Sequence, residues 1–143
     1  LANLLGAGVQ ACFRGPRLYD TEATREMVSR WVGFYKAHRP IFDSDIVPLR
    51  RPDGRDWDGI LHVNPELDEC GLAMIYNPLD RTLERTITLP LYYTGLTDAA
   101  LLRVSDAPPR EVRLDRQHRV AVDLTLPPRG GVYVTVERGH VQK

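Results

Sequence analysis

The sequence has few cysteines and no excess charge of one sign. Only Cys12 and Cys70 occur among 143 residues. Two cysteines are too few for a disulfide framework, and we expect both to be buried thiols. There is no CxxC motif and no His/Cys cluster with zinc spacing, so no metal or other cofactor is predicted. Because 19 basic side chains balance 19 acidic ones, the charge pattern predicts no nucleic-acid partner.

Long apolar runs and catalytic signatures are also missing. No run approaches the ~18 apolar residues of a transmembrane helix, so no membrane partner is predicted. There is no glycine-rich phosphate loop, and neither Ser44 nor Ser105 lies in a nucleophile elbow. The first residue is Leu1, and no signal peptide is visible, which indicates a fragment of a longer polypeptide. These features predict no cellular compartment.

What is present is an ordinary globular composition, with a helical signal confined to the first 42 residues. Apolar side chains recur at helical spacing between Thr21 and Arg39, and we predict a helix there with one broad apolar face. Pro40 is expected to end it. Upstream, the apolar residues from Leu4 to Phe13 predict one buried strand followed by a turn.

From residue 43 onward the apolar period changes to two, and turn residues recur about every ten positions. This pattern predicts a mainly β fold, an antiparallel sandwich of about seven or eight strands preceded by the strand and helix. In the last strand, Tyr133 and Thr135 alternate with valines and are expected to face water. The expected strands are 46–50, 59–64, 72–77, 83–92, 100–104, 111–114, 120–126 and 131–137.

Three segments resemble the C-terminal end of a glycoside hydrolase of the α-galactosidase-like (melibiase) clan. GVQACFRGPRLYDTEATREMVSRWVGFYKAHRPIF resembles the last strand and closing helix of a (β/α)8 barrel. DIVPLRRPDGRDWDGILHVNP and GLAMIYNPLDRTLERTITLPLYYTGL resemble the first strands of the appended β-sandwich. The resemblance implies that residues 1–42 end a truncated barrel and that residues 43–143 form the sandwich.

The resemblance also implies where the chemistry lies. The two catalytic aspartates of this clan are carried on the fourth and sixth barrel strands, upstream of Leu1, so no catalytic residue is predicted in this chain. The chain would be an accessory part that is not catalytic by itself, with the upstream barrel of the same polypeptide as its partner. Carbohydrate is the second possible partner. The alternative is an autonomous carbohydrate-binding or structural β-sandwich module without catalysis.

Three side chains are candidates for substrate binding. If the eighth barrel strand is 9–13, Gln10 and Arg14 lie near the rim where such barrels bind substrate. Arg14 has a rigid fork of donors for sugar hydroxyls, although pairing with a carboxylate such as Asp20, which would order the loop, is the more common role. Trp57 could stack on a pyranose, although a tryptophan in a sandwich is more often part of the core. The neighbouring pair Tyr92-Tyr93 is expected to serve packing, with one ring buried.

Two carboxylate pairs were compared with the geometry of retaining glycosidases, which place two carboxyl groups about 5–5.5 Å apart. Asp43 and Asp45, like Asp56 and Asp58, have i, i+2 spacing, which on a strand gives about 6.5–7 Å. Both pairs occur in turn-rich segments, where aspartate commonly accepts hydrogen bonds from backbone N–H groups. A structural role is therefore expected for both, as it is for His62.

Overall fold

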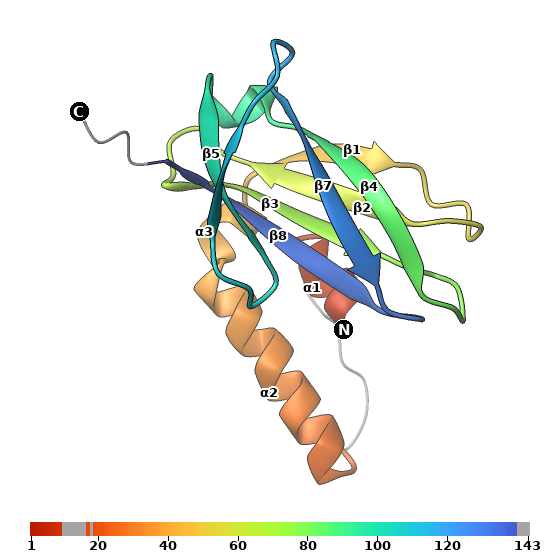
Figure 1. The fold of residues 1–143 in the computed structure, drawn as a ribbon. Helices are drawn as coiled ribbons and strands as arrows, with labels where there is room; N and C mark the ends of the chain where they lie inside the picture. Colours follow the sequence, from red (N-terminus) through yellow and green to blue (C-terminus); the bar gives the residue numbers. More distant parts are fainter. Residues whose placement is uncertain (10–16, 18, 140–143) are drawn as a thin grey trace.

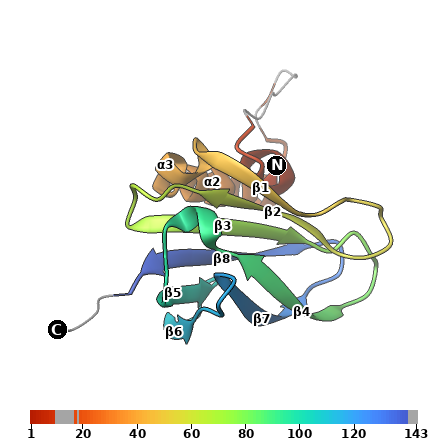
Figure 2. The ribbon, with the colours of Figure 1, turned by 90° about the horizontal axis from the view of Figure 1, so that it is seen from above.

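The computed structural model describes residues 1–9, 17 and 19–139, and it is a β-sandwich with helices on one outer face (Figures 1 and 2). One layer is a six-stranded antiparallel sheet of order β1-β2-β3-β8-β5-β6, and the other is the pair β4-β7. The predicted sandwich is confirmed, and each of its eight predicted strands is present with small shifts at the ends. The strands are β1 (Asp45–Arg50), β2 (Asp58–Val63), β3 (Glu69–Tyr76), β4 (Leu83–Pro90), β5 (Ala99–Val104), β6 (Arg110–Arg113), β7 (Arg119–Leu126) and β8 (Gly131–Arg138).

Strand β8 occupies the centre of the larger sheet. It pairs with β3 on one side and with β5 on the other, so it connects the β1-β2-β3 meander to the β5-β6 hairpin. The registers are antiparallel, with Ile75 opposite Val132 and Leu102 opposite Val136. The sheet therefore depends on a strand that follows all its neighbours in sequence.

The main hydrophobic core lies between the two sheets. Strand β7 contributes by strict alternation: Val120, Val122, Leu124 and Leu126 are buried, whereas the residues between them are exposed. This is the pattern of a strand with one face in the core and one in water. From the six-stranded sheet, the core receives Leu61, Val63, Cys70, Ala73, Ile75, Ala100, Leu102, Val134 and Val136.

The other face of the larger sheet is covered by helices near β3 and β8, contrary to expectation. Helix α2 (Glu22–Ala37) and the single turn α3 (Arg39–Phe42) place Phe34 and Phe42 against this face. The Tyr133 ring lies 4.6 Å from that of Phe34, and Thr135 is buried. The expectation that Tyr133 and Thr135 face water was therefore wrong, because a distant segment covers the strand.

Helix α2 begins where the sequence predicts, with the Thr21 side chain accepting a hydrogen bond from the backbone N–H of Thr24 at 3.2 Å. The helix ends at Ala37, before Pro40, which was expected to end it. Pro40 itself lies inside the first turn of α3. A first helical turn tolerates proline because its N–H groups have no helical partner. The helix therefore stops ahead of Pro40, as predicted, but two residues earlier than Arg39, and Pro40 forms part of a new helical turn.

The first residues also differ from the prediction. Helix α1 (Ala2–Gly6) includes Leu4 and Leu5, which were assigned to a strand, and Leu5 is buried. Backbone packing fixes the segment after it: at Gly8, φ is +69° and an added Cβ would lie 2.6 Å from the carbonyl oxygen of Phe42. Most of the remaining predicted strand, 10–13, lies outside the described residues.

Candidate functional site

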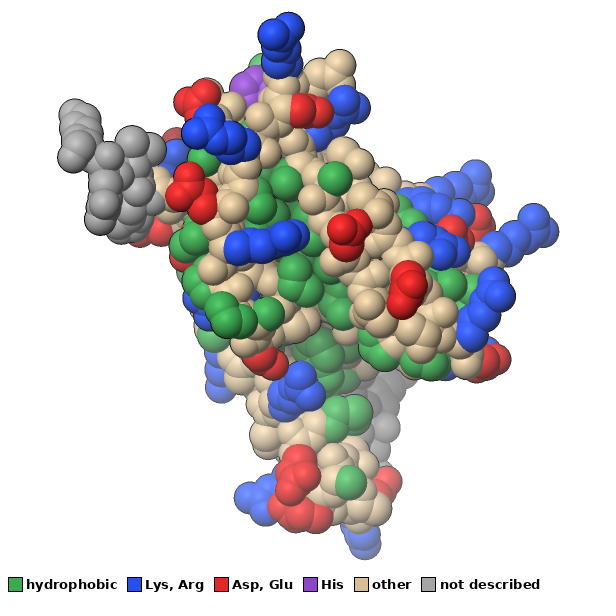
Figure 3. All heavy atoms as spheres, viewed as in Figure 1, with side chains coloured by type: hydrophobic (Ala, Val, Ile, Leu, Met, Phe, Trp, Pro, Cys, Tyr) green, Lys and Arg blue, Asp and Glu red, His purple; other side chains and the backbone are tan. Residues whose placement is uncertain are grey.

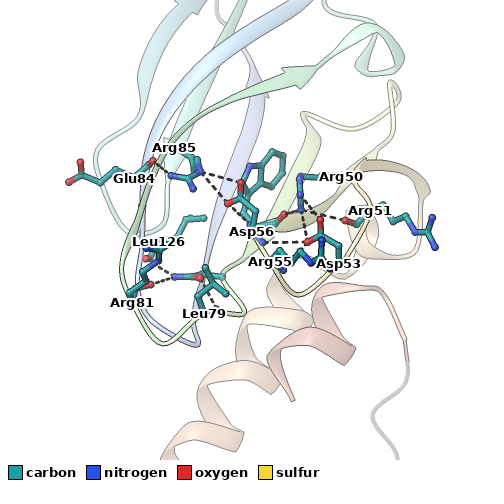
Figure 4. A network of polar contacts seen from close by, with 12 residues as sticks. Arg50, Arg51, Asp53, Arg55, Asp56, Leu79, Arg81, Glu84, Arg85 and Leu126 are labelled. Atoms are coloured by element: carbon teal, nitrogen blue, oxygen red, sulfur yellow. Dashed lines mark hydrogen bonds and ion pairs between the residues drawn. The ribbon is translucent and has the colours of Figure 1, made fainter.

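The loop between β1 and β2 contains Trp57 and is held by a network of charged side chains (Figure 4). Arg50 donates to the carbonyl oxygen of Trp57 at 2.6 Å and pairs with Asp53 at 2.7 Å. Asp53 also accepts from the backbone N–H of Arg55 at 2.9 Å. The hydrogen bond from Arg50, more than any other contact, lowers the pKa of Asp53 to about 2.

Asp56 connects the same loop to the other sheet. Its carboxylate accepts from the backbone N–H of Trp57 at 2.8 Å and from Nε of Arg85, on β4, at 3.1 Å. The half-buried Trp57 side chain packs against the main core. These contacts hold Trp57 as part of the framework, and its role in sugar binding stays a prediction. The other two predicted binding residues, Gln10 and Arg14, lie outside the described residues.

The other predicted carboxylates are placed at structural positions. Asp43 accepts hydrogen bonds from the Tyr35 hydroxyl and from Nε of Arg39, both at 3.1 Å. Asp58 lies opposite Tyr76 in the β2–β3 pairing, and burial raises the pKa of its carboxyl group. It borders a mainly apolar groove of about 510 Å³ on the helical side of the sheet, which also includes Ile46, Pro48, Ile60 and Tyr76.

His62 is a core residue, as expected. It is fully buried, its Nε2 lies 2.7 Å from the carbonyl oxygen of Gly6, and the ring contacts Phe42 edge-on. Burial lowers the pKa of the imidazole. Among the described residues, no group of three or more His, Cys, Asp or Glu side chains is arranged to hold a metal ion.

Cys70 is buried as a free thiol, as expected, whereas Cys12 lies outside the described residues. Burial raises the pKa of the Cys70 thiol. Within the described part of the chain, no helix is both long enough and apolar enough to cross a bilayer.

The feature that sequence reasoning missed is the exposure of Tyr92 and Tyr93. They do not extend strand β4 but form the short 3₁₀ helix η1 (Tyr92–Thr94), and their exposed fractions are 64% and 62%. The expected burial of one ring was wrong. The sequence did contain a signal, because Pro90 and Gly95 bracket the pair and favour a turn over a continuing strand.

The fold is similar to part of two larger solved structures. The crystal structure of AmyP in complex with maltose matches 89% of this chain with 24% of its own, at 10% identity and a TM-score of 0.50. The alpha-amylase from Geobacillus thermoleovorans, complexed with acarbose, matches 85% of this chain with 25% of its own, at 18% identity and a TM-score of 0.52. No protein-family model and no curated protein matches the sequence.

These similarities define the class of fold: a β-sandwich with associated helices that also occurs as part of an alpha-amylase. The chain spans about a quarter of the length of each matching structure. At these levels of identity, the comparison concerns the fold, while substrate and activity depend on the residues themselves.

Proposed function

We propose that this chain is an accessory β-sandwich of a glycoside hydrolase and supports a catalytic barrel carried elsewhere in the same polypeptide. In this proposal residues 1–42 belong to the end of the barrel and residues 43–143 form the sandwich. The catalytic aspartates lie on the barrel. The single observation that carries the proposal is the group of exposed large apolar side chains that precede residue 47.

The exposed apolar side chains are concentrated in the first part of the chain. Six of the eight exposed large hydrophobic residues in the described part of the chain precede residue 47. They are Leu1, Leu4, Val9, Tyr19, Met27 and Ile46. The aromatic side chains Trp31, Phe34 and Tyr35 of helix α2 pack on the sandwich, whereas Met27, nearer the start of the helix, stays exposed. Figure 3 shows hydrophobic side chains at the surface where α2 leaves the sandwich. A concentration of exposed large apolar side chains in one segment is typical of a surface that another domain covers, which supports a partner domain there.

The type of hydrolase is a finer question. The segments quoted above resemble the α-galactosidase-like clan. Of the two solved structures with a similar fold, however, one is an alpha-amylase and the other is a complex with maltose. We favour a hydrolase of α-linked hexosides, which both lines of reasoning share. Assays of the long polypeptide with an aryl α-galactoside and with soluble starch distinguish the two types.

A matched pair of charge substitutions tests the docking face. Met27, which is 47% exposed on α2, is changed to glutamate, and the control is Gln117→Glu in the exposed turn before β7. In the polypeptide that includes the upstream sequence, Met27→Glu should lower the melting temperature and promote proteolytic release of the sandwich. The control should do neither. Equal melting temperatures for the two variants, or hydrolysis by the 143-residue chain alone, would contradict the proposal.

The autonomous carbohydrate-binding module is the second candidate. It is favoured by the exposure of Tyr92 and Tyr93. Their short helix η1 lies at the opposite end of the sandwich from α2 in Figure 1. An upstream sequence that encodes no catalytic domain would favour this candidate over the first.

A further inference from the structure

The exposed aromatic pair Tyr92-Tyr93 has no structural task that accounts for it. Apart from the group before residue 47, these are the exposed large hydrophobic residues of the described chain. We propose that the pair is a surface glycan-binding site. The choice of a glycan as the ligand rests on the proposed function, whereas the existence of the site rests on the geometry of the turn.

The rings are exposed although the backbone beneath them is firmly held. Leu91 is fully buried, and its N–H donates to the carbonyl oxygen of His118 at 2.8 Å. The buried Thr94 hydroxyl donates to the carbonyl oxygen of Leu91 at 2.6 Å, and Gly95 ends the turn with φ of +74°. A rigid turn presents both rings in a fixed geometry, so little conformational entropy is lost when a ligand binds.

The geometry of the rings suits a sugar. Their centroids are 5.3 Å apart and their planes are perpendicular, at 87°. Each phenol ring has a negative face that attracts the C–H groups on the apolar face of a pyranose. Perpendicular rings offer such a face in two directions, as a bent oligosaccharide chain requires.

Polar groups for the sugar hydroxyls lie beside the rings. The His118 ring is 5.5 Å from the Tyr92 ring, and its Nδ1 lies 3.1 Å from the carbonyl oxygen of Leu96. Since a carbonyl oxygen only accepts, Nδ1 carries the hydrogen, which leaves Nε2 of the neutral ring as an acceptor. Gly95, which ends the turn, also lines a groove of about 250 Å³ with Thr97, Asp98, Glu111 and Arg138, although the two tyrosines are not part of its lining.

A protein partner fits this surface less well. At the observed exposure, two tyrosines present roughly 250 Å² of surface, if each side chain has about 200 Å² in all. A stable protein interface buries about 800 Å² on each side. In Figure 1, η1 lies at the end of the sandwich opposite α2, so it stays accessible when a partner covers the helices.

The test is native gel electrophoresis of the 143-residue chain through gels that contain amylose or galactomannan. We expect at least one polysaccharide to slow the chain. The double variant Tyr92→Ala/Tyr93→Ala should raise the dissociation constant at least tenfold, since loss of stacking on two rings is involved. The corresponding double phenylalanine variant should bind like the parent, because stacking persists. Tyr19→Ala removes an exposed tyrosine elsewhere and should change nothing.

Two results would overturn the inference: no retardation by either polysaccharide, or retardation that the double alanine variant leaves unchanged. The inference would also be overturned if the chain dimerised with rising concentration, bound no glycan, and lost the dimer in the double alanine variant. That result would assign the pair to contact between copies. Failure of the proposed function would give a different result from failure of this inference. The tyrosines would still bind glycan, but the upstream sequence would encode no hydrolase domain.

Discussion

Replacing Asn77 with alanine should strongly destabilise the sandwich. Asn77 is 2% exposed and joins the turn after β3 to the turn between β7 and β8. Its Nδ2 donates to the carbonyl oxygens of Arg81, Leu126 and Pro127 at 2.8, 3.2 and 3.0 Å. Its Oδ1 accepts from the backbone N–H of Leu79 at 2.9 Å. Part of this arrangement is drawn in Figure 4.

The expected loss of stability follows from the number of hydrogen bonds that the Asn77 side chain can make. The amide has two N–H hydrogens for three carbonyls, so it makes about two full hydrogen bonds as donor and one as acceptor. At about 1 kcal/mol for each, Asn77→Ala should lower the free energy of unfolding by about 3 kcal/mol. For a domain of this size, that is a fall of about 10 °C in melting temperature.

Urea denaturation followed by tryptophan fluorescence measures this loss. The control is Asp80→Ala in the same turn, which removes the ion pair with Arg129 at 2.6 Å. Both partners are largely exposed, so the control should be close to the parent. The reasoning fails if Asn77→Ala costs less than about 0.5 kcal/mol, or if the control costs as much.

Three further outcomes are expected. Burial lowers the pKa of His62 below that of the unfolded chain, so the unfolded state binds the proton first as pH falls. Stability should decline as pH falls below about 6.5, and His62→Gln should flatten this decline in denaturation curves compared with His118→Gln. Gly8→Ala should loosen the packing of residues 1–9 on α3, because its φ is positive and Phe42 O blocks a Cβ, and hydrogen exchange at these residues should rise. His38 at the end of α2 contacts the Glu69 carboxylate at 2.8 Å with both side chains mostly buried, so Glu69→Ala should speed proteolysis within α2, whereas Glu66→Ala should not.

Strand positions were predictable because their signals are local. Each strand has a period-two pattern, and turns such as Pro52-Asp53-Gly54 mark the ends. Long-range choices were not predictable in this way. Tyr133 reads as a solvent-facing residue until Phe34, about a hundred positions earlier, packs on it. Leu4 and Leu5 read as a strand although the segment folds as one helical turn against β3.

At the candidate site too, local features could be predicted from the sequence and long-range contacts could not. The structural role of Asp56 was predictable from its turn, but its partner Arg85 lies on another sheet and was not. The two tyrosines were assigned to packing because a strand was extended past Pro90, although the ladder ends there and the chain turns. A proline at a strand end is a local signal, so this error was avoidable.

The place of β8 has a consequence for biosynthesis. While the ribosome is still adding residues before 131, the β1-β2-β3 meander and the β5-β6 hairpin have no strand to join them. The larger sheet cannot be completed until β8 has left the exit tunnel, so we expect the sandwich to close late in synthesis. A nascent chain stalled before that point is therefore a natural substrate for chaperones, and removal of β8 should yield aggregates instead of a smaller domain.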